Sequence, residues 1–165
     1  MVGRANSRAR LTGMARDDLT PKALRQMPSW LLGQTSVHAH RLLTGALSAE
    51  DARPYHYRVL ASLQEFGPAS QVEVGGYANL DRSDVVAAVD ELVDRGFVER
   101  SADPVDRRRN IITITRAGRA HLRRLDKVLA RVQDELLTPL TATQRKELIR
   151  LLGRLLEHHT DISSR

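Results

Sequence analysis

The stretch from Asp81 to Thr115 constrains the fold more than any other part of this chain. Its first part has helical periodicity, because Val85, Val89 and Leu92 recur at intervals that place them on one side of a helix. An aspartate precedes this run and a glycine follows it, and these residue types favour the start and the end of a helix. The pattern predicts a helix over Arg82–Asp94.

Two β-prone runs follow the predicted helix and flank a charged tip. The first run is Phe97–Arg100, and the second, Ile111–Thr115, is rich in β-branched residues. The tip, Asp103–Asn110, contains a proline and three consecutive arginines. This arrangement predicts a β-hairpin. A short helix followed directly by a basic-tipped hairpin is the outline of a winged helix-turn-helix. We therefore predict a mainly α fold with a small β-hairpin wing.

The composition favours a nucleic-acid partner and argues against several classes of protein. The 165 residues suit one domain, and the formal net charge is +6, carried mostly by arginine. A basic chain favours a polyanionic partner, although a general preference for arginine would give the same balance. The absence of cysteine excludes disulfides, Cys-ligated zinc and thiol-based redox sensing. No apolar run suits a membrane span or a signal sequence, so we expect a cytoplasmic protein.

Four regions follow from the patterns along the chain. Residues 1–19 form a basic tail without apolar periodicity, which we expect to be flexible and which either contacts DNA phosphates or is a solvated end. Residues 20–50 are predicted to form an N-terminal helical region that is interrupted near Pro28. Residues 51–115 are predicted to form the winged helix-turn-helix unit. Residues 116–162 are predicted to form two C-terminal helices with leucine stripes.

The helix that should precede the predicted helix Arg82–Asp94 is intrinsically weak. The segment Ser70–Tyr77 is rich in valine and contains Gly75 and Gly76, which disfavour an isolated helix. Tertiary packing must therefore hold it in place. The preceding helix is clearer, since Pro54 opens it and Gly67 ends it, with an apolar side between them.

Several segments together resemble one known family. They are Arg53–Leu60, Asp81–Ser83, Val89–Leu92, Arg95–Arg100, Asp103–Pro104, Asp106–Arg108 and Ile114–Gly118. In these segments the chain resembles the MarR family of transcription regulators, over roughly residues 21–159. The resemblance implies a DNA-binding homodimer joined by its terminal helices. It also implies that small ligands bind between those helices and the winged helix.

The candidate DNA-binding residues lie on the predicted recognition helix and on the wing. On the helix, Arg82 and Ser83 are the polar candidates, and Val86 and Ala87 face outward and could touch thymine methyl groups. The acidic neighbours of these residues, and an alanine where many family members carry arginine, weaken the case for strong base readout. On the wing we select Asp106, Arg107, Arg108 and Arg109. By resemblance, Arg108 enters the minor groove and Asp106 orients it.

Two other groups of residues have side-chain types that binding sites use. Trp30, His38, Arg41 and Tyr57 combine aromatic rings with cationic or titratable groups, which suits a small anionic or phenolic effector as well as it suits core and surface roles. His38 and His40 lie two residues apart and would point to different faces of a helix, so we predict no metal site and no cofactor. No arrangement of catalytic groups is recognisable, so we do not expect an enzyme.

The C-terminal leucine stripes predict a homodimer. Leu122, Leu125, Leu129, Val132 and Leu136, with Leu148, Leu152 and Leu155, need a surface to cover them, and a second subunit is the predicted cover. The sequence thus predicts a ligand-responsive repressor that binds a pseudopalindromic duplex as a homodimer. The alternative is a winged-helix module that binds a protein and little DNA.

Overall fold

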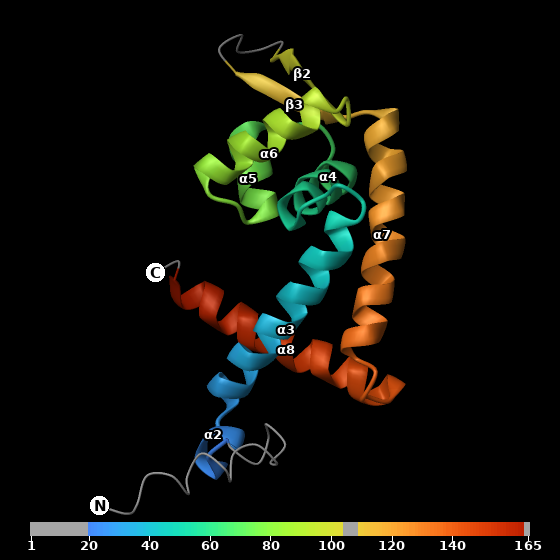
Figure 1. Cartoon of the computed structure of the whole chain (residues 1–165). Helices are drawn as coiled ribbons and strands as arrows, with labels where there is room; N and C mark the ends of the chain where they lie inside the picture. Colours follow the sequence, from blue (N-terminus) through green and yellow to red (C-terminus); the bar gives the residue numbers. More distant parts are fainter. Residues whose placement is uncertain (1–19, 104–108, 164–165) are drawn as a thin grey trace, which may run out of the picture. The chain divides into compact units, whose positions relative to one another are not determined.

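The computed structural model describes residues 20–103 and 109–163, and side chains up to residue 160 (Figure 1). The chain divides into two compact units, Met1–Arg41 and Leu42–Arg165. Within the described residues, no helix combines the length and apolar character that crossing a membrane requires.

The N-terminal region contains two helices separated by a break. Helix α2 spans Lys22–Arg25, and helix α3 spans Pro28–Ser48 and continues from the first unit into the second. The predicted interruption near Pro28 is confirmed as a fresh helix start. Proline has no backbone N–H and fixes its own φ, so it suits the first turn of a helix rather than its interior.

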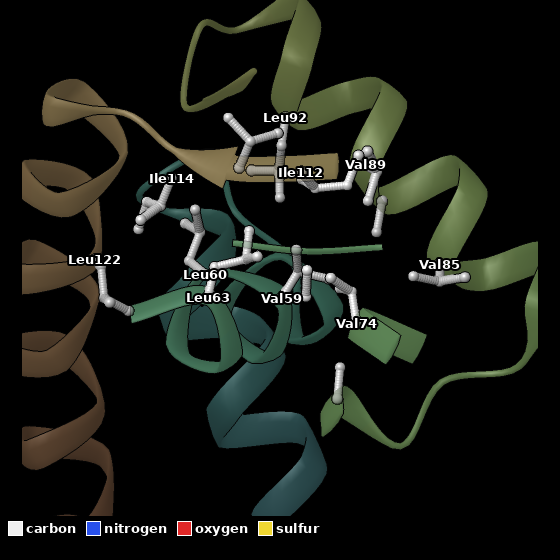
Figure 2. Close-up of a cluster of buried hydrophobic side chains, with 14 of the residues drawn as sticks. Val59, Leu60, Leu63, Val74, Val85, Val89, Leu92, Ile112, Ile114 and Leu122 are labelled. Carbon is white, nitrogen blue, oxygen red and sulfur yellow. The ribbon is translucent and has the colours of Figure 1, made fainter. Parts of the chain in front are cut away.

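The second unit is built around helix α4, Pro54–Phe66, which packs against the helices α5 (Gln71–Ala78), α6 (Arg82–Asp94) and α7 (Arg116–Leu136). Helix α8, Ala142–Ser163, completes the unit. Figure 2 shows side chains from α4, α5, α6, α7 and the sheet pointing toward one another in a single apolar core. Leu60, Val89 and Leu92 lie at its centre and are fully buried. This packing supplies the tertiary support that the glycine-containing α5 needs.

The predicted hairpin is present, and it belongs to a three-stranded antiparallel sheet. Strand β2, Val98–Ala102, pairs with β3, Asn110–Ile114, and the strand order is β1-β3-β2. The short strand β1, Ala69–Ser70, was not predicted, because two residues carry no periodicity. It pairs Ala69 with Ile112 and thereby joins the start of α5 to the wing.

Local capping explains where the helices of the helix-turn-helix begin and end. The Asp81 carboxylate accepts a hydrogen bond of 2.9 Å from the Asp84 N–H, as predicted for the start of α6. Ser70 and Glu73 form a reciprocal capping box at the start of α5. Asn79, with φ of 49°, and Gly96, with φ of 67°, adopt the left-handed conformation that ends each helix.

Helix α7 begins directly behind the wing at Thr115, whose hydroxyl accepts from the Gly118 N–H at 3.0 Å. One part of the predicted leucine seam is not available to a partner. Leu122, Leu125 and Val132 are at most 5% exposed within the single chain. The prediction that a second subunit covers these three side chains is therefore wrong. Periodicity shows that a stripe is apolar and does not show which surface covers it.

Candidate nucleic-acid interface

The exposed side of α6 is the surface that sequence analysis selected for base contact. Arg82, Ser83, Val86 and Ala87 are all solvent-exposed. The Ser83 hydroxyl donates to the Asp81 carboxylate at 2.8 Å, so the side chain that caps the helix also holds this hydroxyl. These residues line one shallow hollow together with Asp90. The four candidates thus lie together on one surface of the helix.

Two of the four acidic residues of α6, Asp90 and Glu91, are compensated by cations and hydrogen-bond donors of neighbouring elements. Asp90 forms an ion pair with Arg100 of strand β2. Glu91 is turned toward the start of α4, where it accepts hydrogen bonds from Tyr55 Oη at 3.1 Å and from His56 Nε2 at 3.0 Å. Consequently these carboxylates present less negative charge to a polyanionic partner than the sequence indicates.

His56 connects the start of α4 to the end of α6. Its Nδ1 accepts from the Arg53 N–H at 3.2 Å, which leaves the ring proton on Nε2 to be donated to Glu91. The imidazole is 2% exposed, and this burial lowers the pKa of His56. A polar cavity of about 430 Å³ lies beside it, lined also by Arg95 and Asp51, which form a 3.3 Å ion pair. The orientation of α6 is therefore set by polar contacts as well as by its apolar side.

The wing is only partly described. Asp106, Arg107 and Arg108 lie outside the described residues, so their predicted roles remain predictions. Arg109 is exposed at the end of the tip, and its guanidinium lies 3.9 Å from the Glu73 carboxylate. The Asp103 N–H donates to the Arg109 carbonyl at 2.9 Å, which closes the base of the tip.

The predicted effector residues are divided between the two units. Trp30 is half-buried and His38 and Arg41 are exposed in the first unit, whereas Tyr57 lies on α4 in the second. The Tyr57 hydroxyl donates to Asp126 of α7 at 3.1 Å, and burial raises its pKa. Their joint effector site stays a prediction. No cluster of His, Asp and Glu in the described part of the chain suits a metal ion.

Three side chains that shape this interface are not among the site residues predicted from the sequence. Arg100 pairs with a residue ten positions earlier, and His56 and Glu91 lie 35 positions apart. One local signal existed for His56, since a polar residue three positions after the start of a helix often accepts the first backbone N–H. Nothing local indicated its bond to Glu91.

Comparisons with known proteins agree on one family. The MarR family model matches residues 54–109, which run from the start of α4 to the end of the wing tip. A Thauera aromatica protein described as a transcriptional regulatory protein for the hcr operon is 30% identical over 108 residues, or 66% of this chain. The matched part covers 65% of that relative, so the chain spans slightly less than two thirds of its length.

Two solved structures are similar over most of the chain. The transcriptional repressor CouR, bound to a 23-mer DNA duplex, is 27% identical with a TM-score of 0.77, covering 84% of this chain and 98% of CouR. The PcaV regulator of Streptomyces coelicolor, in complex with its natural ligand, is 29% identical with a TM-score of 0.71, covering 84% of this chain and 98% of PcaV. With its capped helix α6 and three-stranded wing, the chain belongs to the MarR family of winged helix-turn-helix transcription regulators.

Proposed function

We propose that the protein is a transcription repressor that binds a pseudopalindromic DNA site as a homodimer and responds to a small anionic or phenolic effector. The observation that carries the proposal is the exposed surface of α6, where Arg82, Val86 and Ala87 are accessible. The negative charge of Asp90 on this surface is compensated by its ion pair with Arg100. A major groove admits one helix with such a surface. The similarity to a repressor solved on DNA supports the same role.

The exposed apolar stripe of α8 supports the dimer. Ile149, Leu152, Leu155 and Leu156 are between 40% and 70% exposed, which is unusual for leucine and isoleucine at helical spacing on one element. A twofold dimer would place two α6 helices about one DNA turn apart, roughly 34 Å. An effector that binds better to a dimer with a different spacing would lower DNA affinity.

The test is selection of bound duplexes from a genomic library, followed by binding curves across salt concentration. Parent protein should select a pseudopalindrome, and its affinity for that site should fall steeply with salt. Replacing Arg82 with alanine should cost roughly 1–3 kcal/mol and relax preference at one base position. Arg108→Ala should weaken all duplexes and reduce the salt slope by about one unit.

A matched control is Arg150→Ala, which removes the same charge from α8, where Arg150 pairs with Glu147. This variant should bind the selected site like the parent. Salt-independent or undetectable binding of every duplex by the parent would contradict the proposal and favour the protein-binding module.

A further inference from the structure

We propose that, apart from the contact of Arg82, α6 recognises its half-site through the C5 methyl groups of pyrimidines, in practice thymine, rather than through hydrogen bonds to base edges. This inference rests on the proposed DNA-binding function and specifies the chemistry that the DNA must present. It follows from which polar groups of α6 are already engaged and which side chains remain on its outer surface.

Most hydrogen-bonding groups near the outer surface of α6 are used inside the protein. The Ser83 hydroxyl donates to Asp81, and the Asp81 carboxylate also accepts from the backbone of α6. Asp90 is paired with Arg100, and Glu91 is bound by Tyr55 and His56. A side chain held in this way gives up an existing bond before it can bond to a base, so it contributes little net discrimination.

The accessible lining of the two hollows beside α6 is mainly apolar. Val86 is 38% exposed, Ala87 is exposed beside it, and both line the hollow on the outer surface of α6. Val72, at the start of α5, is 83% exposed and lines an adjoining hollow that Arg82 also borders. Arg82 is the one cationic residue among those that line the two hollows.

The major groove offers one apolar feature to such a surface. Thymine carries a methyl group at C5, where unmodified cytosine has only a hydrogen, and the major-groove edges of the purines present hydrogen-bonding atoms. Burying a methyl group against Val86 and Ala87 is favourable, and burying an unpaired base donor or acceptor against them is not. The positive charge of Arg82 complements the DNA and can be satisfied by a phosphate or a guanine next to the methyl contact.

The experiment uses the full-length protein and a duplex selected for tight binding. Each thymine of one half-site is replaced in turn by deoxyuridine, which removes the methyl group and keeps the base pair. We expect one or two positions in the major groove to lose affinity by about fourfold each, equivalent to about 0.8 kcal/mol for one buried methyl. The other positions should show no change.

A second pair of duplexes separates the methyl group from the A·T base pair. At each sensitive position, the T·A pair is replaced by C·G or by 5-methylcytosine·G, which differ only in the C5 methyl. The methylated duplex should bind about fourfold better than the unmethylated one. Equal binding of the two would overturn the inference, because the protein would then be recognising the base pair and not its methyl group.

Replacing Val86 with alanine links the effect to this side chain. The substitution is at an exposed helical position and favours the helix, so thermal unfolding should show an intact fold. In this variant the deoxyuridine penalty at one sensitive position should disappear, while other positions keep theirs. A full penalty at every position would refute the assignment. If the parent binds the thymine duplex but tolerates deoxyuridine throughout, only this inference fails. If the parent binds no duplex, the proposed function fails with it.

Discussion

His56 is a buried imidazole that the fold holds in its neutral form. Burial lowers its pKa, and the nearby cations Arg95 and Arg53 act in the same direction, whereas Glu91 opposes them. His121 on α7 is similar: it is 2% exposed, stacks on Phe97 at 4.4 Å, and has its pKa lowered by burial and by Arg124. Its Nε2 has no hydrogen-bond partner in the described part of the chain. Protonation of either ring in the folded state is therefore unfavourable.

These two rings predict acid sensitivity in a defined pH window. The unfolded chain protonates histidine near pH 6.5, and the folded protein does so only at lower pH. Stability should thus be complete above about pH 6.5 and decline as the pH falls below it, until the folded pKa is reached. Urea unfolding between about pH 7.5 and 5 measures this decline.

The matched variant is His56→Gln, because glutamine can accept the Arg53 N–H at the same capping position and does not titrate. Its stability should depend less on pH within that window than the stability of the parent. A decline as steep as that of the parent would show that His56 is not its source.

Residue-level prediction succeeded where the signal was local. Asp81 and Gly96 were assigned as the start and end signals of a helix from their own type and position, and each has that role in the structure. The bond of His56 to Glu91 depends on how α4 packs against α6. No local pattern encodes that packing, so the polar part of the candidate site could not be predicted.

At the level of elements, two helical glycines differ in whether the structure leaves space for an added Cβ atom. A Cβ at Gly76 on α5 would meet no atom within 4 Å, whereas a Cβ at Gly118 on α7 would lie 2.0 Å from the Phe97 carbonyl oxygen. Gly76→Ala should stabilise the protein by about 0.5–1 kcal/mol, since alanine favours the helix. Gly118→Ala should destabilise it by about 3 kcal/mol, because backbone must move.

Thermal or urea unfolding of the two alanine variants gives a matched comparison of the same chemical change. Destabilisation at Gly76 would mean that α5 is positioned differently from the structure described above. A neutral effect at Gly118 would mean that α7 does not approach the start of β2 so closely.

The ion pair between β2 and α6 makes a separate prediction about DNA binding. Arg100→Ala would leave the Asp90 carboxylate unpaired near the DNA, which should weaken binding by about 1 kcal/mol, or roughly fivefold. Adding Asp90→Asn should restore much of the affinity, because no uncompensated charge remains. If the double variant binds as weakly as Arg100→Ala alone, Arg100 contacts the DNA directly and does not act through Asp90.

The helices and strands themselves were predicted better than the packing and strand pairing that hold them in place. The hairpin and the bounds of α6 followed from periodicity and turn residues, as did the weakness expected of α5. What holds α5 in place is the capping box of Ser70 and Glu73 and the packing of Val74 into the core. Strand β1 was missed because its pairing with β3 depends on residues about forty positions away.

For the whole molecule, the exposed leucines of α8 predict a dimer. Leu152 and Leu155 are 40% and 49% exposed in the single chain, and a partner would remove them from water. The double variant Leu152→Glu/Leu155→Glu should therefore shift the protein to monomer and abolish tight binding to a pseudopalindrome, while binding to single half-sites persists.

Light scattering at micromolar concentration is the measurement. Arg154→Glu is the control, because it changes the net charge by the same amount at another exposed position of α8. The parent and the control should both be dimers. A parent protein that is monomeric under these conditions would contradict the prediction.

The pairing of β1 with β3 also has a consequence for how the molecule opens locally. Ser70 pairs with Ile111 of the wing and, in the same position, caps α5. Detaching the wing from β1 thus disturbs the first turn of α5, and fraying of α5 releases one side of β3. Amide hydrogens in β3 and in the first turn of α5 should exchange with solvent deuterium at a common rate, as one cooperative unit. Gly76→Ala should then slow exchange in β3, although the substitution lies on another element.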